Sequence, residues 1–315
     1  MGYRLKGDES VADGVRRVVL EEIDKATTML RTDGNESDHD HDHDHDHDHD
    51  HDDGIHEARK SFKKIRAVLR LVRPSLGAAY GRENAWFRDV ARELSGLRDA
   101  QAVLESLEKL RKASPEQTDH DVFADIRTML KRRRTAAEDD DADLAKTVER
   151  VRANLDDVRQ RIEAWDLRRA GFAAIGPGLK RTYLRGRQAQ AITRRSPSDE
   201  AFHEWRKRAK YHWYHVRLLQ DLWPGMLKPY RASLKEMSTI LGDDHDLVVL
   251  KQAVAASDST VRDSTACATF TALVDRRQQQ LRAAARSLGE RIYAEKPKCL
   301  HGRFQSYWQT WRGDT

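Results

Sequence analysis

The sequence has few of the residues that stabilise small disulfide-bonded or β-rich proteins. Its 315 residues include 2 cysteines, 7 prolines and 17 glycines. Two cysteines provide neither a disulfide framework nor a zinc-ligand set, and the scarcity of turn residues argues against a propeller or a β-sandwich. Abundant Ala, Leu, Arg, Lys and Glu favour helices. We therefore expect an all-α fold.

Long apolar runs and familiar catalytic motifs are also absent. No stretch of 18 apolar residues predicts a transmembrane helix, and the first residues, MGYRLKGDES, lack the apolar stretch of a signal peptide. There is no G-x-x-x-x-G-K-[ST] loop and no G-x-G-x-x-G fingerprint. HEARK and HEWRK begin like a zinc-protease helix but lack its second histidine. We expect a cytoplasmic protein that is not an enzyme and requires no cofactor.

The charge is unevenly distributed along the chain. The formal net charge is +5, yet residues 38–53 alternate His and Asp and carry nine aspartates without a lysine or arginine. Without this tract the formal charge would be +14. So basic a body suggests a polyanionic partner. The partner could be nucleic acid, polyphosphate, an anionic membrane or an acidic protein. A helical surface that is simply solvated would explain the charge equally well.

The two halves of the chain match at a constant offset of 147 residues. The segment 55–72, IHEARKSFKKIRAVLRLV, aligns without gaps on 202–219, FHEWRKRAKYHWYHVRLL. The same offset aligns Leu94 with Leu241 and Asp99 with Asp246. We interpret this as an internal duplication whose second copy begins near Leu167.

Hydrophobic periodicity predicts about four helices in each copy. We expect helices over 11–31, 55–73 (ending at Pro74), 83–112 with a break near Gly96, and one or two over 120–164. In the second copy we expect helices over 168–193, 199–222, 229–256 and 258–294, with a break at Pro224. This pattern predicts two four-helix bundles related by pseudo-twofold symmetry, residues 1–166 and 167–315, together forming one domain. Three C-terminal aromatic residues, Tyr307, Trp308 and Trp311, are expected to cap an apolar surface.

The matching helices are amphipathic, with a cationic face. At 100° per residue, the basic side chains of the first copy fall within an arc of about 120° centred near His56. They are Arg59, Lys60, Lys63, Arg66 and Arg70, and the second copy repeats His203, Arg206, Lys207, Lys210 and Arg217. The opposite face carries Ala58, Phe62, Ile65, Val68, Leu69 and Val72. A row of cations repels itself unless an anion lies along it. Its length of about 20 Å suits a linear polyanion.

At these residues the sequence resembles the CHAD family, the conserved histidine α-helical domain. The family signature, H-x-x-R-K-x-x-K/R-x-x-R in each of two repeats, is matched by His56 to Arg66 and by His203 to Lys210. Tyr214 fits the aromatic residue that follows in the second repeat. The segments WFRDVARELSGLRDAQAVL, LKRTYLRGR and ILGDDHDLVVL match as well, so that the resemblance covers nearly the whole chain.

The resemblance implies two antiparallel four-helix bundles around a basic groove or pore that binds inorganic polyphosphate, often at polyphosphate granules. Carried over by position, the candidate ligands are His56, Arg59, Lys60, Lys63, Arg66, His203, Arg206, Lys207 and Lys210, with Arg88, Arg92, Arg98, Lys180, Arg181 and Arg185 as weaker candidates. Trp213 replaces the arginine that the second repeat usually has, which favours the first half as the stronger binder. The E-x-E-x-K motif of fused triphosphate tunnel domains is absent.

The His-Asp tract permits three interpretations. Disorder is the default, because the tract has no apolar residue to bury. In an extended conformation all its histidines would lie on one side and could chelate Zn, Ni or Cu. They are His39, His41, His43, His45, His47, His49 and His51. As a tethered polyanion the tract could also compete for the cationic stripe.

We predict a polyphosphate-binding helical protein that is cytoplasmic and can associate with granules. One alternative is a nucleic-acid-binding protein, although aromatic residues are not interleaved along the first stripe and no known nucleic-acid motif is present. The other is a protein that docks on granules or regulates a polyphosphate-metabolising enzyme.

Overall fold

The computed structural model describes residues 2–31, 53–94, 96–113, 120–138, 141–257 and 265–313. Within these ranges the chain is helical and contains no strand, as predicted. The His-Asp tract lies outside the described residues. The first helices are α1 (Val11–Met29), α2 (Asp53–Leu76), α3 (Ala78–Glu93), α4 (Gly96–Ala113), α5 (His120–Glu138) and α6 (Asp141–Glu163). They are followed by α7 (Phe172–Arg195), α8 (Asp199–Leu218), a 3₁₀ turn η2 (Gln220–Leu222), α9 (Pro224–Ala255), α11 (Thr265–Ile292) and α12 (Pro297–Gly313).

Local sequence signals account for most helix boundaries. The Ser10 and Ser198 side chains each accept a hydrogen bond from the backbone N–H three residues later, which caps the first turns of α1 and α8. Gly77 and Gly171 have φ of 57° and 54° and precede α3 and α7, because only glycine adopts this conformation without strain. The predicted break near Gly96 is confirmed. The predicted stop at Pro74 is two residues early, since α2 continues to Leu76.

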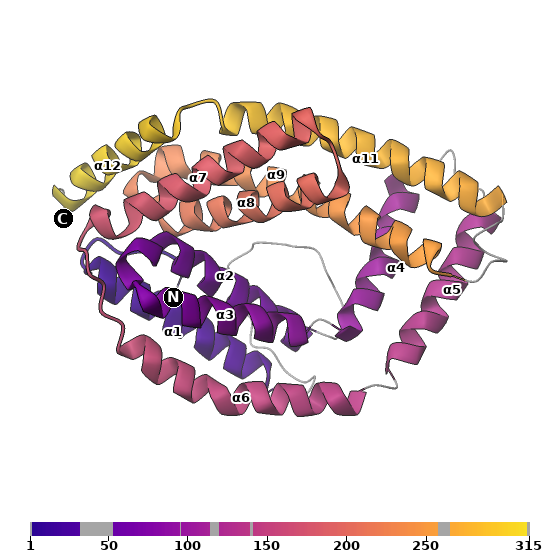
Figure 1. Ribbon diagram of the computed structural model, residues 1–315, viewed down its shortest axis with the longest axis horizontal. Helices are drawn as coiled ribbons and strands as arrows, with labels where there is room; N and C mark the ends of the chain where they lie inside the picture. Colours follow the sequence, from indigo (N-terminus) through magenta and orange to yellow (C-terminus); the bar gives the residue numbers. More distant parts are fainter. Residues whose placement is uncertain are drawn as a thin grey trace.

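Two buried apolar clusters hold the helices together. Figure 1 shows α4 and α5, which contribute to the smaller cluster, toward one end of the long axis and α1, α2 and α3 toward the other. The larger cluster is built from α1, α2, α3, α6, α7, α8 and α12 with parts of α9 and α11. The smaller one joins α4 and α5 to the other ends of α9 and α11. Each cluster therefore contains helices from both sequence halves. The division into one four-helix bundle per half, at residue 166, stays a prediction.

The basic motif helices α2 and α8 lie at the centre of the larger cluster. The predicted apolar face of α2 is fully buried, with Phe62, Ile65 and Val68 each 0% exposed. The two helices contact each other, and α2 also packs against α1, α3 and α7. Gly178 of α7 permits the last of these contacts, because a Cβ atom there would lie 1.8 Å from the carbonyl oxygen of Leu71.

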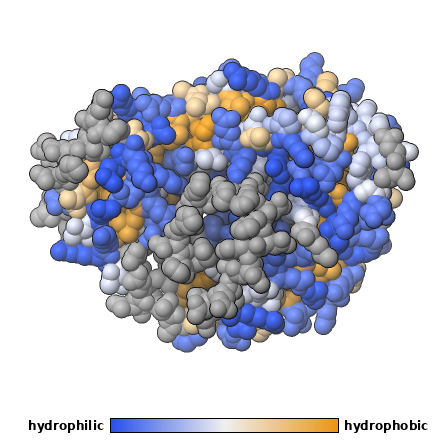
Figure 2. Space-filling view, turned by 180° about the vertical axis from the view of Figure 1, so that it is seen from behind, coloured by the Kyte–Doolittle hydropathy of each residue, from blue (hydrophilic) through white to orange (hydrophobic). Residues whose placement is uncertain are grey.

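The C-terminal helix covers an apolar surface, as predicted from its aromatic residues. Trp308 is 6% exposed and its ring lies 6.2 Å from that of Phe172 on α7, whereas Tyr307 contacts Trp223. The opposite view of the molecule, in Figure 2, shows a described surface that is largely hydrophilic with scattered apolar patches. None of the described helices is both long and apolar enough to cross a membrane.

Candidate functional site

Six arginines from four helices form the main cationic group, which we call the arginine cluster. They are Arg66 and Arg70 of α2, Arg88 of α3, Arg181 and Arg185 of α7, and Arg208 of α8. Burial, together with the nearby charges of Arg70 and Arg88, lowers the pKa of Arg66. Burial and the charges of Arg208, Arg181 and Arg70 lower that of Arg185. The Arg185 shift shows that guanidinium groups from the two sequence halves lie close enough to repel each other here.

Neutral side chains hold the centre of this cluster in place. Arg70 donates a hydrogen bond of 2.5 Å to the amide oxygen of Asn84 on α3, and Arg66 approaches the same oxygen at 3.5 Å. The Arg70 guanidinium lies over the ring of Tyr211 on α8, 4.2 Å from its centroid. An amide and an aromatic ring orient the arginines without cancelling their charge. Their fixed orientation reduces the entropy lost when they grip an anion.

Some cations of the stripe do have carboxylate partners, so the stripe is less purely cationic than its sequence suggested. Glu57 pairs with Lys60 at 3.3 Å, and the equivalent Glu204 pairs with Lys207 at 2.6 Å. Glu204 also contacts Arg208 at 2.9 Å. These glutamates stand one residue after each motif histidine, and the helix brings them beside the lysines three residues later.

The two outer arginines of α3 share another carboxylate. Arg88 lies 2.9 Å from Asp89, and Arg92 pairs with the same side chain. These side chains are well exposed. Exposed pairs of this kind are worth about 0–1 kcal/mol, so that a strong anion can displace them.

A pair of histidines, one on α8 and one on α9, lies nearer the N-terminus of α8 than Arg208 does. The Nδ1 atoms of His203 and of His245 on α9 are 3.2 Å apart. Burial and the charges of Arg206, His203 and Lys207 lower the pKa of His245 to about 4. Burial, Lys207 and Arg206 also lower the pKa of His203. Both rings are therefore mainly neutral at pH 7, and a nearby anion would favour their protonation by offsetting the neighbouring cations.

The histidine pair is bordered by a group of opposite charges from four helices. Asp243 of α9 is 4.0 Å from Lys109 of α4. Burial and the neighbouring Asp246 raise the pKa of Asp243, while Lys109, Arg277 and Arg206 act in the opposite direction. The cationic surface thus continues from α8 toward α4 and α11.

The structure separates one predicted ligand from the rest. Arg217 is 9% exposed and lies over the ring of Tyr3, where its charge also acts on Lys64. Lys64 in turn pairs with Glu22 at 3.0 Å. Arg217 therefore belongs to a buried group on the other side of the α2–α8 contact.

The remaining candidates lie on the outer faces of their helices or outside the described part. Lys63, Lys180 and Arg181 are exposed, and His56, Arg59, Arg206 and Lys210 are half-buried. Lys210 lies 5.0 Å from the ring centroid of Trp213, the residue that departs from the family pattern. Arg98 is in α4, but its side chain is not among those described, and the seven tract histidines proposed as metal ligands lie outside the described residues. Within the described part no group of three or more His, Cys, Asp or Glu side chains could hold a metal.

Four residues of this surface were missed by sequence reasoning. Asn84 and Tyr211 are uncharged and carry no signal by themselves, and Arg208 follows the motif without belonging to it. His245 could have been found, because the offset of 147 places it opposite Arg98, which was already a candidate.

Two further histidines of α8 serve packing. Both His212 and His215 are 0% exposed. His212 Nε2 lies 2.9 Å from the Tyr230 hydroxyl, and His215 Nε2 lies 2.8 Å from the carbonyl oxygen of Ala67 in α2. Burial lowers their pKa values to about 3 and about 4.

Fold and surface together define an all-helical protein in which two histidine-led basic helices meet and bring arginines from both halves together. The family model described as CHAD domain matches residues 37–255, and the chain belongs to this family. The structure also resembles the crystal structure of the CHAD domain from the plant Ricinus communis, with a TM-score of 0.61 and 15% identity over 92% of this chain and 94% of that one. A search of curated proteins gave no match.

Proposed function

We propose that this protein binds inorganic polyphosphate through the surface formed by the arginine cluster and the histidine pair, without catalysing a reaction. The observation that carries the proposal is the proximity of Arg70 and Arg185, which come from different halves of the chain and repel each other. Like charges held together cost free energy in the absence of a ligand, and a bound polyanion removes that cost.

The chemistry of the surface suits a chain of phosphates better than one small anion. Arginine donates two parallel hydrogen bonds to phosphate oxygens, and lysine acts as a movable point charge. The cluster extends over four helices, and the histidine pair and Lys109 prolong it toward α4. A linear polyanion can contact all these groups at once, whereas orthophosphate can contact only a few.

We also infer that the two halves arose by duplication and are related by a pseudo-twofold axis near the α2–α8 contact. Arg70 lies over Tyr211, while Arg217 lies close to Lys64. The offset of 147 residues converts the first pair into the second, with the helices exchanged. This is the relation expected of a twofold axis between equivalent helices.

A titration with polyphosphates of several lengths, triphosphate and single-stranded DNA tests the proposal. Affinity should rise with polyphosphate length, and polyphosphate should displace DNA more readily than the reverse. Arg185→Glu should weaken polyphosphate binding by about tenfold or more, because it both removes and reverses an exposed charge of the cluster. Arg276→Glu, an equal charge change on the exposed surface of α11, is the matched control.

Other outcomes would favour the two alternatives. If DNA displaced polyphosphate equally well, the nucleic-acid-binding alternative would be favoured. If neither bound, a role in docking or regulating a polyphosphate-metabolising enzyme would remain. Placement in the cytoplasm or at polyphosphate granules is part of the proposal, and a fluorescent fusion imaged with a polyphosphate stain tests it.

A further inference from the structure

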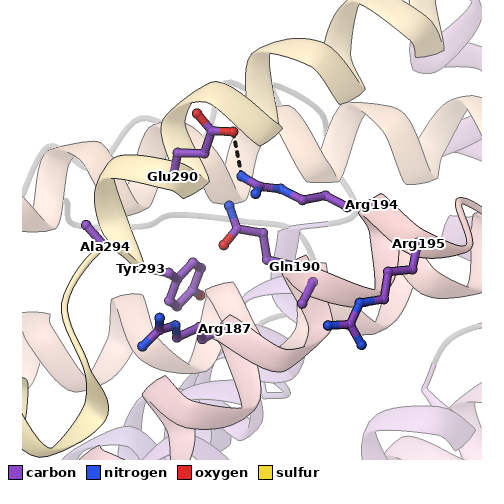
Figure 3. Close-up of a pocket in the computed structure, with 8 residues that line it drawn as sticks. Arg187, Gln190, Arg194, Arg195, Glu290, Tyr293 and Ala294 are labelled. Atoms are coloured by element: carbon purple, nitrogen blue, oxygen red, sulfur yellow. Dashed lines mark hydrogen bonds and ion pairs between the residues drawn. The ribbon is translucent and has the colours of Figure 1, made fainter.

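A second cationic site lies between α7 and the end of α11. It is a cavity of about 620 Å³, a size typical of small-molecule sites. Its lining includes three arginines and one carboxylate, Glu290. Figure 3 shows Arg194 and Glu290 pointing toward each other, with Gln190, Tyr293 and Arg187 below them.

The charge of this pocket favours an anion. Arg187, Arg194 and Arg195 are opposed by Glu290 alone. Arg194 pairs with Glu290 at 2.5 Å, and one nitrogen of Arg187 donates to the carbonyl oxygen of Glu295 at 3.2 Å. A guanidinium has five N–H donors, so each arginine keeps donors for a ligand. The 48% exposed Arg194 side chain can turn from Glu290 to a phosphate at little cost.

The floor of the pocket is rigid and partly apolar. Tyr293 is 3% exposed and Gln190 is 6% exposed, with Ala191 and Ala294 beside them. A Cβ atom on Gly186 would lie 2.4 Å from the Tyr293 hydroxyl, and one on Gly289 would lie 2.8 Å from the Gln190 amide nitrogen. These two glycines therefore let α7 and α11 approach closely enough to fix both side chains.

Gln190 provides an independent indication of a ligand. Its amide nitrogen is buried and forms no hydrogen bond with any described residue. A buried donor without a partner is costly, and native structures rarely keep one without a reason. Turning the amide about its last torsion would present this N–H₂ group to an acceptor in the pocket.

Two of the three pocket arginines lie on the face of α7 opposite to the arginine cluster. At 100° per residue, Arg187 and Arg194 project about 180–200° away from Arg185, while Arg181 lies about 40° from it. Arg195 lies between the two faces, about 80° from Arg185. A ligand held by Arg187 and Arg194 would therefore not occupy the polyphosphate surface. The two sites can be tested separately.

We propose that this pocket binds a small organic phosphate of nucleotide size. The phosphates would contact Arg187, Arg194 and Arg195, and the organic group would lie against Tyr293, Ala191 and Ala294, with Gln190 hydrogen-bonding to its polar edge. The proposal is independent of polyphosphate binding, since none of these residues belongs to the arginine cluster.

Isothermal titration calorimetry with ATP, tripolyphosphate and adenosine tests this proposal. ATP should bind more tightly than tripolyphosphate or adenosine, because only ATP uses both parts of the pocket. Arg187→Gln combined with Arg194→Gln should weaken ATP binding by about tenfold or more relative to the control Arg132→Gln with Arg276→Gln. Ala191→Met, which fills the pocket without changing charge, should weaken ATP binding as well.

Several results would overturn the proposal. They are equal ATP affinity in the pocket and control variants, failure of Ala191→Met to reduce it, or tripolyphosphate binding as tightly as ATP. Arg70→Gln with Arg185→Gln should impair long-chain polyphosphate binding and leave ATP binding intact. Failure of the pocket proposal can thus be distinguished from failure of the proposed function.

Discussion

The salt dependence of polyphosphate binding measures how many cations of the cluster contact the ligand. Arg66, Arg70, Arg181 and Arg185 form no ion pair with a carboxylate of the described residues, whereas Arg88 and Arg208 have Asp89 and Glu204. Each phosphate neutralised on a flexible single-stranded polyanion lowers the slope of log K against log salt by about 0.7. Four contacts therefore predict a slope of about −3, roughly four times the change of about 0.7 for one phosphate.

Removing one arginine from each half should halve this slope. Arg70→Gln with Arg185→Gln leaves two of the four cations, and the expected slope is about −1.4. A hydrogen bond to a charged group contributes about 1.5–3 kcal/mol, and solvent exposure of Arg185 reduces its share. We therefore expect a loss of affinity of about a hundredfold at low salt, equivalent to about 3 kcal/mol.

Fluorescence anisotropy with labelled polyphosphate across a series of salt concentrations gives both quantities. The control variant Arg132→Gln with Arg276→Gln has the same net charge but keeps the cluster, so its slope should match the wild type. Circular dichroism and thermal unfolding establish that each variant is folded. A double variant with the slope of the wild type would refute the assignment of Arg70 and Arg185 to the ligand.

Three further predictions concern protonation and packing. Because bound phosphates raise the depressed pKa values of His203 and His245, binding should take up protons and strengthen between about pH 7 and pH 5. Calorimetry in buffers of different ionisation enthalpy detects this uptake, which His203→Gln with His245→Gln should abolish. The pKa of His215 falls from 6.5 in the unfolded chain to about 4 in the fold, so its contribution is present above pH 6.5 and is lost as pH falls toward 4. Urea unfolding curves should therefore show the free energy of unfolding fall by about 3 kcal/mol over this pH range, and the fall should be smaller in His215→Gln. Gly178→Ala should lower the free energy of unfolding by about 3 kcal/mol or more, because the new Cβ would overlap the Leu71 carbonyl. Gly302→Ala, which has open space around it, should be nearly neutral. Equal melting temperatures for the two variants would contradict the close approach of α7 to α2.

Local sequence signals predicted the helices well but not how they pack. The hydrophobic period and the Gly and Pro residues identified the breaks near Gly96 and Pro224, because these depend on a few neighbouring residues. The predicted start of the helix at 229 is five residues late, since α9 begins at Pro224. The packing of α4 and α5 on α9 and α11 could not be predicted in this way. It depends on contacts between residues more than a hundred positions apart, for which one sequence carries no signal.

The candidate site was predictable to a similar extent. The motif identified α2 and α8 and, on α2, Arg66 and Arg70 of the cluster, whereas Arg217, the repeat partner of Arg70, lies in the buried group beside Tyr3. It could not reveal that Asn84 and Tyr211 orient Arg70, because neutral residues have no charge pattern. It also overestimated how uniformly cationic the stripe is, since Glu57 and Glu204 each neutralise a lysine one turn away.

The contrast between Arg70 and Arg217 shows why equivalent residues need not share a function. On one side of the α2–α8 contact, Arg70 lies near Arg185, bonded to the Asn84 amide and stacked over the Tyr211 ring. On the other side, the N-terminal segment covers Arg217 with Tyr3, whose hydroxyl donates to the carbonyl oxygen of Lys64.

Glu22 of α1 supplies the negative charge on that covered side, where it pairs with Lys64. A buried cation is tolerated only when an anion or aromatic ring compensates it, so the N-terminal segment neutralises the second side within the protein itself. On the first side the described carboxylates Asp89 and Glu204 pair with Arg88 and Arg208, and no described carboxylate pairs with Arg70. We therefore expect a polyphosphate to gain the full attraction of the arginines only there, so that a motif present in both halves would form one binding surface rather than two.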